Sequence, residues 1–189
     1  MKREDLRKLI HLATTGFAFT LKWIPPWMGY AACATAIVLW WIVLPAIGRD
    51  RGLTRENETY VNGLKTYPIA ILLLLVLFPL DVAAAGWGVL GVGDAFSNLV
   101  GRRMGRPGLL GRPDRSLAGT VAFVVTAIPA AWGLAVYVGP IDARTAWGPA
   151  VAAGLAGAAA ELLPMPLPLE DNLPVAIAAA AAFLAVAGG

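Results

Sequence analysis

The chain has 189 residues, of which 58% are hydrophobic and 14% are charged, and its mean hydropathy is +0.69. Soluble proteins carry about 45–50% apolar and about 25% charged residues, so this composition excludes an ordinary soluble domain. The net charge of +3 is small, and the short basic loops lack the interleaved aromatic residues of a nucleic-acid-binding surface. We therefore expect one integral membrane domain over residues 1–189, with no nucleic acid among its partners.

The apolar runs predict an all-α, polytopic bundle of about seven transmembrane helices. A helix needs about 20 apolar residues to cross the hydrocarbon core, and a proline pair at 25–26 ends the first, short helix near Trp23. A secretory signal peptide is the alternative for this first run, but His11 and three threonines interrupt it. The further spans are expected at residues 27–47, 67–85, 87–100, 117–138, 145–163 and 173–186.

The distribution of basic residues predicts the orientation of the bundle. With seven spans, 13 of the 15 Lys and Arg residues fall on one side, and only Lys22 and Arg144 fall on the other. Because Lys and Arg accumulate in cytoplasmic loops, this side faces the cytoplasm and contains the N-terminus. We expect a multi-pass protein of the cell (inner) membrane.

The stretch GVGDAFSNLVGRR at residues 91–103 places a carboxylate, Asp94, in an otherwise apolar helix. At helical spacing Gly91, Asp94, Asn98 and Gly101 share one face. An ionised side chain inside a membrane costs at least about 2.5–3.5 kcal/mol, so it is a functional candidate. Asp94 is interpreted as a Mg²⁺ ligand or general base, to which Asn98 adds an amide oxygen. The alternative is a structural carboxylate that binds a neighbouring helix.

The loop after this helix is rich in arginine and glycine. Arginine grips phosphate with two parallel hydrogen bonds, and glycines allow close backbone approach. Ser116 and Thr120 open the next helix, whose N-terminal N–H groups favour an anion. A polyphosphate site is the favoured interpretation and a membrane anchor the alternative. The arginines are Arg102, Arg103, Arg106, Arg112 and Arg115.

Other polar residues are expected on the same cytoplasmic side. His11 lies one turn after Arg7 and Lys8, at head-group level, with a packed core histidine as the alternative. Glu161 ends the sixth span, where the helix dipole disfavours a carboxylate, so it needs a metal or an arginine partner. Asp171 is a candidate site residue, or a simple helix cap. Asp81 and the single cysteine, Cys33, are interpreted as structural.

Four motifs in order resemble the membrane CTP-dependent lipid kinases, the family of dolichol kinase, phytol kinase and a fungal diacylglycerol kinase. The motifs are RKLIH, GVGDAFSNLVGRRMGR, RSLAGTVAF and ELLPMPLPLEDNLPVAI, and they extend from Arg7 to Pro174. The glycine–aspartate helix and the basic loop also resemble phosphatidate cytidylyltransferase, a more distant relative that uses CTP as well.

The resemblance implies roles for residues of each motif. Arg115, Ser116 and Gly119 match a Lys/Arg-Ser/Thr-x-Glu-Gly motif, in which this chain has Ala118 at the glutamate position. The role of that glutamate is therefore either absent from this chain or supplied by another carboxylate, and Glu161 is the candidate. The other matching residues are Asp94, Asn98 and Gly101 before the nucleotide loop, Glu161, Asp171 and Asn172 in the closing motif, and Arg7, Lys8 and His11 in the opening motif.

The implied reaction is transfer of the γ-phosphoryl group of CTP to the hydroxyl of a lipid alcohol such as a polyprenol, dolichol, phytol or diacylglycerol. Asp94, with Glu161 or Asp171 as further candidates, would hold Mg²⁺, the arginines would neutralise the triphosphate, and a second carboxylate would accept the hydroxyl proton. The lipid tail is expected between spans with small residues, such as Ala152, Ala153, Gly154 and Gly157. The alternatives are a cytidylyltransferase that makes CDP-diacylglycerol and a non-catalytic lipid-binding or transport protein.

Overall fold

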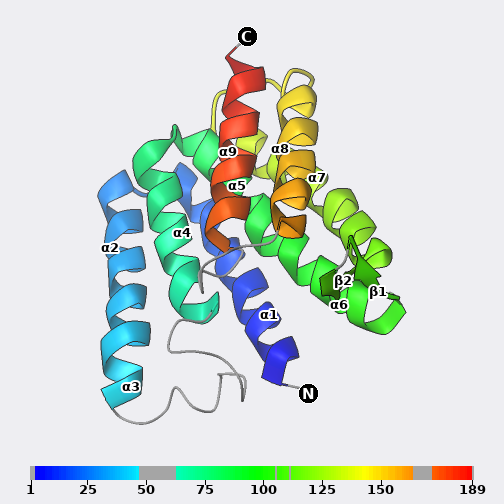
Figure 1. The fold of residues 1–189 in the computed structure, drawn as a ribbon. Coiled ribbons are helices and arrows are strands. Elements are labelled where there is room, and N and C mark those ends of the chain that lie inside the picture. The colour runs from blue at the N-terminus through cyan, green and yellow to red at the C-terminus, as the bar shows by residue number, and fades with distance from the viewer. Residues whose placement is uncertain (1–2, 47–62, 105, 111, 164–171, 189) are drawn as a thin grey trace.

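The protein is a bundle of helices with a short β-hairpin at one edge (Figure 1). The computed structural model describes residues 3–46, 63–104, 106–110, 112–163 and 172–188. The expectation of a helical bundle is confirmed. Within these ranges two helices, Pro26–Ala46 and Leu117–Val138, are long and apolar enough to cross a membrane, and Leu64–Leu77 and Asn172–Ala187 are shorter apolar helices.

Several helices follow one another without a break and form longer rods. The first rod is α1 (Arg3–Thr15) with the 3₁₀-helix η1 (Gly16–Lys22), and the second is α2 (Pro26–Val38) with the π-helix η2 (Leu39–Val43) and α3 (Leu44–Ala46). After α4 (Gly63–Leu77), a long rod consists of α5 (Leu80–Gly88), the π-helix η4 (Val89–Gly93) and α6 (Asp94–Met104). The remaining helices are α7 (Leu117–Val138), α8 (Trp147–Leu162) and α9 (Asn172–Ala187).

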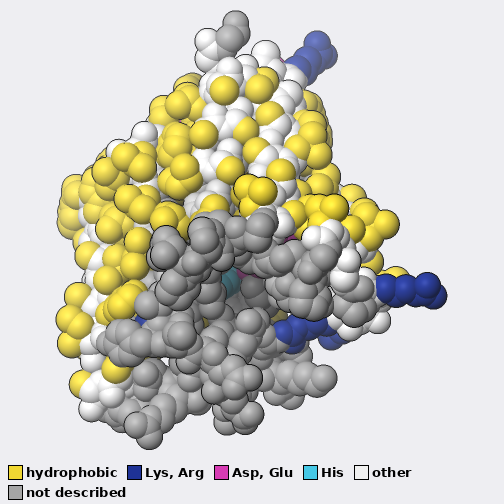
Figure 2. Space-filling view, in the orientation of Figure 1, with side chains coloured by type: hydrophobic (Ala, Val, Ile, Leu, Met, Phe, Trp, Pro, Cys, Tyr) yellow, Lys and Arg dark blue, Asp and Glu magenta, His cyan; other side chains and the backbone are white. Residues whose placement is uncertain are grey.

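The polar ends of the elements gather at one end of the bundle. Figure 1 shows the N-terminus, the end of α3, the start of α4, the end of α6 and the hairpin in the lower half of the view. The C-terminus lies at the opposite end, as does the turn between α7 and α8. The apolar side chains cover the upper and left parts of the face seen in Figure 2. We call the end with the hairpin the basic end.

The core is built from small side chains, which let the helices approach closely. A Cβ atom on Gly154 would lie 2.5 Å from Ile128 Cγ1, and one on Gly157 would lie 2.6 Å from Val89 Cγ1. Ala153 is fully buried. The small-residue stretch of α8 therefore serves close packing against α7 and η4.

The third and fourth helices have other boundaries than the sequence predicts, since α4 already begins at Gly63 and α6 continues to Met104. The third span was expected over 67–85, but α4 ends at Leu77 and a new helix begins at Leu80. Pro79 causes the break, since it has no N–H to continue the helix. The fourth helix consequently begins at Leu80 instead of Trp87, and Asp81 lies in its first turn.

The basic loop is a β-hairpin, which the sequence did not indicate. β1 (Pro107–Leu109) pairs antiparallel with β2 (Arg112–Ser116), with Leu109 opposite Arg112. Gly108 has a φ of 105°, a conformation that a side chain disfavours. The hairpin joins the end of α6 directly to the start of α7 and holds those two helix ends together.

Candidate functional site

The site begins where α1 lies antiparallel to the rod of η4 and α6. A Cβ atom on Gly91 would collide with Thr15 Oγ1, and one turn along each helix Asp94 faces His11. Gly91 is needed because α1 approaches so closely. This approach brings the carboxylate of one helix to the imidazole of the other.

Asp94 is held by two neighbouring side chains. Its Oδ2 lies 3.9 Å from His11 Nδ1, which is an ion-pair distance and too long for a hydrogen bond. Its Oδ1 accepts a hydrogen bond of 2.9 Å from Asn98 Nδ2. Only 13% of the Asp94 side chain is exposed, so the carboxylate is confined to a fixed orientation. Asn98 presents its amino group to Asp94, and thus orients the carboxylate instead of adding an oxygen beside it.

His11 is held in place by Tyr67, whose ring stacks on the imidazole and whose hydroxyl is hydrogen-bonded to neighbouring groups. The Tyr67 ring stacks on the imidazole with centroids 4.2 Å apart. Tyr67 Oη accepts a hydrogen bond of 2.9 Å from Trp87 Nε1 and donates one of 3.2 Å to the His11 carbonyl. Thr15 Oγ1 lies 3.1 Å from the same phenol oxygen. Tyr67, Thr15 and Trp87 were not predicted as site residues. Their role depends on contacts between different helices, which the spacing of residues along the sequence does not reveal.

Glu161 joins two helices, α8 and α6, to the hairpin. It is only 1% exposed, and its Oε1 accepts hydrogen bonds from Ser97 Oγ at 2.9 Å and from Arg115 Nη1. Ser97 is on α6, one turn after Asp94, whereas Arg115 is the last residue but one of the hairpin. A metal or an arginine was expected beside Glu161, and Arg115 is the arginine that pairs with it.

Two glycines allow α6 to meet the start of α7. A Cβ on Gly119 would lie 2.9 Å from the Ser97 carbonyl oxygen, and one on Gly101 would lie 3.0 Å from Ser116 Oγ. Ser116 caps α7, since its hydroxyl accepts a bond of 3.2 Å from the Gly119 N–H. The positive end of the α7 dipole therefore lies beside Asp94's helix and favours an anion there.

Further arginines lie around this helix start. Arg102 and Arg103 occupy the last turn of α6, and they are exposed, as is Arg106. Partial burial lowers the pKa of Arg102, but a guanidinium remains charged at neutral pH because its ordinary pKa lies far above 7. Arg112 lies on β2, and its side chain is outside the described residues.

The predicted residues at the chain's two outer motifs are only partly described. Arg7 and Lys8 lie on α1, four and three residues before His11, but their side chains are outside the described residues, as is the whole of Asp171. Asn172 begins α9, where its Nδ2 donates a hydrogen bond of 3.0 Å to Thr66 Oγ1 of α4. This bond ties the closing motif to the basic end of the bundle.

The donor set at Asp94 fits Mg²⁺ only as part of a nucleotide complex. In the described part of the chain, no three His, Cys, Asp or Glu side chains gather in a group that could hold a metal ion. Mg²⁺ commonly takes one or two carboxylates and completes its octahedron with phosphate oxygens and water. Asp94 meets that requirement, while the Oε1 of Glu161 already serves Ser97 and Arg115.

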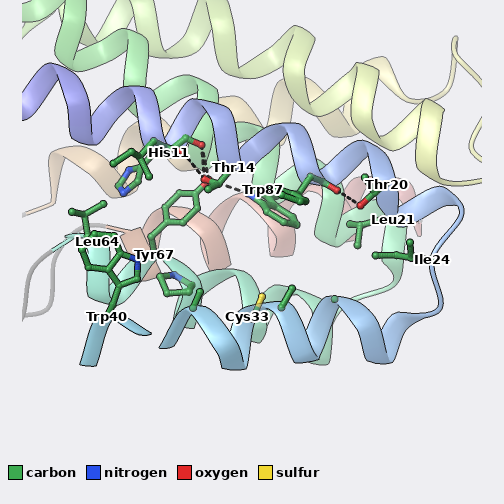
Figure 3. A pocket seen from close by; sticks show the side chains of 16 residues that line it. His11, Thr14, Thr20, Leu21, Ile24, Cys33, Trp40, Leu64, Tyr67 and Trp87 are labelled. Carbon is green, nitrogen blue, oxygen red and sulfur yellow. Dashed lines mark hydrogen bonds between the residues drawn. The ribbon is translucent and has the colours of Figure 1, made fainter. Parts of the chain in front are cut away.

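An apolar cleft of about 250 Å³ leads away from His11 (Figure 3). Its walls come from α1 and η1 on one side and from α2 and α4 on the other. Figure 3 shows His11 near Leu64 and Trp40 at one end of the cleft, with Cys33 midway and Leu21 and Ile24 at the other end. The small residues of α8, where a lipid groove was expected, pack against neighbouring helices instead. The cleft lies elsewhere, next to His11, which faces Asp94.

Comparison of the chain with protein-family models, with curated proteins and with solved structures finds no match. A function for this chain therefore has to be inferred from the geometry described above and from the resemblance of its four motifs.

Proposed function

We propose that this protein is a CTP-dependent kinase that phosphorylates a lipid alcohol at the cytoplasmic face of the cell (inner) membrane. The observation that carries the proposal is the pair of Asp94 and His11 at the end of the apolar cleft. A kinase for a lipid needs its polar groups where an apolar channel meets a charged surface. Here the cleft supplies the channel, and the arginines of the basic end supply the charge.

The bundle spans the membrane seven times in this proposal, with the N-terminus and the basic end in the cytoplasm. The distribution of cationic residues supports the orientation. Among the described residues, Arg102, Arg103 and Arg106 lie at the basic end. At the opposite end lie Lys22, which ends η1, and Arg144, in the turn between α7 and α8. Cationic residues favour the cytoplasmic side, which matches the side on which CTP is available.

Phosphoryl transfer requires positioning and charge neutralisation more than covalent help. The triphosphate would lie across the start of α7 and contact the exposed guanidinium groups of Arg102 and Arg103. Asp94 would be the protein ligand of Mg²⁺, and the metal ion would supply positive charge to neutralise the phosphates. Asn98 orients that carboxylate through its 2.9 Å hydrogen bond.

The acceptor hydroxyl would meet His11. As the oxygen of the alcohol forms a bond to the γ-phosphorus, the bond between the γ-phosphorus and the bridging oxygen of CDP breaks. The hydroxyl proton passes to the imidazole, and Asp94 stabilises the imidazolium across 3.9 Å. The products are CDP and a lipid phosphate, whose chain stays in the bilayer. Glu161 has a positioning role, since it holds Arg115 and Ser97 in place.

Product analysis separates this proposal from its two alternatives. The purified protein would receive a mixed lipid extract and CTP labelled in either the α- or the γ-phosphate. A kinase transfers the γ label to lipid and releases CDP, whereas a cytidylyltransferase transfers the α label and releases pyrophosphate. Ala118, which stands at the motif's glutamate position, is the feature that favours a non-catalytic lipid-binding protein. Such a protein would transfer neither label, and that result would end the proposal.

A further inference from the structure

The apolar cleft lies where the first rod and α2 have different packing partners. α2 packs against α4, whereas α1 and η1 pack against η4, α6, α5 and α7. The cleft occupies the space between the first rod and α2. α2 belongs to the helix Pro26–Ala46, which is long enough to cross a membrane and mostly exposed. The surface around the cleft, including Phe17 at 63% exposure, therefore faces lipid.

The hydroxyl groups along the cleft bond to other groups of the protein. Thr14 Oγ1 donates to the carbonyls of Ile10 and His11, both at 2.9 Å, and Thr20 Oγ1 donates to the Phe17 carbonyl at 2.7 Å. The phenol of Tyr67 is held by Trp87 and the His11 carbonyl. Walls whose hydroxyls bond to the protein itself offer little to a polar ligand and favour a hydrocarbon.

The size of the cleft limits what it can hold. Its volume of about 250 Å³ is less than twice the roughly 150 Å³ cavity that holds a single benzene ring. The cleft thus has room for a segment of one hydrocarbon chain and none for two chains side by side. Its two ends also differ, because His11 is at the end near Asp94, whereas the apolar side chains of Leu21 and Ile24 line the opposite end.

We propose that this cleft seats the single hydrocarbon chain of the acceptor alcohol, with the hydroxyl at His11 and the chain directed toward Ile24. The protein accordingly prefers alcohols with a single hydrocarbon chain to glycerolipids with two chains. This inference rests on the function proposed above for the identity of the ligand as an acceptor. Binding in the cleft can nevertheless be measured without any phosphoryl transfer.

Cys33 provides a reporter inside the cleft, because it lines the wall and is the only cysteine of the chain. The purified full-length protein in lipid nanodiscs would be treated with N-ethylmaleimide, with and without geranylgeraniol as the single-chain probe. At ten times its Kd, a bound chain leaves about one site in eleven empty, so alkylation of Cys33 should slow about tenfold. Dioleoylglycerol at the same concentration should protect Cys33 less.

Two variants of α2 form a matched pair. Ala36 lines the cleft, whereas Ala34 lies on the exposed surface of the same helix. Ala36→Phe should fill the cleft, remove the protection by geranylgeraniol and raise its KM in the transfer assay. Ala34→Phe should behave as the wild type in both measurements, which also shows that α2 tolerates a phenylalanine.

The outcomes separate the two proposals. Protection of Cys33 without transfer of phosphate would support the chain seat and contradict the kinase. Transfer of phosphate by Ala36→Phe with an unchanged KM for geranylgeraniol would overturn the chain seat and leave the kinase standing. Equal alkylation of wild-type Cys33 with and without geranylgeraniol would also overturn the seat, as would stronger protection by dioleoylglycerol.

Discussion

Asp94 and Glu161 are carboxylates that the bundle nearly removes from solvent, and each is accompanied by specific partners. An ionised carboxylate in a low-dielectric interior is tolerated only when charges and hydrogen bonds replace its water. Asp94 has His11 and Asn98, and Glu161 has Arg115 and Ser97. The two sets meet on α6, where Asp94 and Ser97 are one turn apart.

Sequence spacing could predict only part of this arrangement. Asn98 follows Asp94 by four residues, so their contact along one helix was predictable. The contacts of His11 with Asp94 and of Arg115 with Glu161 join elements distant in sequence. Those pairings depend on how far each helix is shifted along its neighbour. A single sequence holds no information on that shift, and it left a metal open as the alternative for Glu161.

Replacement of Glu161 by alanine should destabilise the bundle strongly. The change leaves the guanidinium of Arg115 and the hydroxyl of Ser97 without their shared acceptor, and breaking a buried ion pair costs about 3–5 kcal/mol. Thermal unfolding in detergent measures the effect as a lower Tm. Ser97→Ala is the control, since it leaves the ion pair of Glu161 and Arg115 in place and should cost less, about 1.5–3 kcal/mol for one hydrogen bond to a carboxylate. An unchanged Tm for Glu161→Ala would refute the structural role given to this pair.

Among the elements, those with a clear terminal signal were predicted best. α7 has the expected bounds because Ser116 caps its start and Gly139 follows its end. The break at Pro79 was missed because long apolar runs on either side carry no periodicity that marks a new helix. The hairpin was missed as well, since strands of three and five residues are too short to show alternation.

The contact between α6 and α7 should depend on Gly119. A Cβ there would lie 2.9 Å from a backbone oxygen of α6, so Gly119→Ala must push the two helices apart. We expect a loss of about 1–3 kcal/mol, as in other overpacked interiors, together with lower turnover because the start of α7 moves.

Gly133 offers the matched control on the same helix. A Cβ at this position would meet no atom within 4 Å. Gly133→Ala should therefore keep full activity and gain up to about 1 kcal/mol from its better helix propensity. The Tm and the turnover of Gly119→Ala and Gly133→Ala test this difference. Equal Tm and equal turnover of the two variants would contradict the close contact of α6 and α7 at Gly119.

For the whole molecule, composition predicted the helical class of fold, and the orientation inferred from charge stays a prediction. Small residues were expected either to pack closely or to line a lipid groove, and in α8 they pack. The cleft arises elsewhere, from the differing partners of the first rod and α2. No local pattern marks such a gap, because it results from the arrangement of several helices.

The proposed topology makes a direct prediction for two exposed arginines. Arg103 lies at the basic end and Arg144 in the turn between α7 and α8, so a spanning α7 places them on opposite sides of the membrane. In a Cys33→Ser background, a membrane-impermeant maleimide should label Arg144→Cys in intact cells. Arg103→Cys should react only after permeabilisation. Labelling of both from the same side would refute the seven-span arrangement.

In the proposed mechanism Asp94 links the nucleotide to the acceptor alcohol, so its conservative replacement gives the most direct test. Asp94→Asn keeps the size of the side chain, and the hydrogen bond from Asn98 Nδ2 to the backbone oxygen of residue 94 is unaffected by it. Asp81→Asn is the control, because Asp81 lies at the other end of the same rod and accepts a bond of 2.9 Å from the Val82 N–H.

The measurement is the transfer of the γ-phosphate label of CTP to lipid by the purified protein in vesicles, for the wild type and both variants. The account predicts that the wild type and Asp81→Asn form lipid phosphate at similar rates. Asp94→Asn should be slower by about 100-fold or more, with an unchanged Tm. Transfer by Asp94→Asn at the wild-type rate, or no transfer by the wild type to any lipid alcohol, would contradict it.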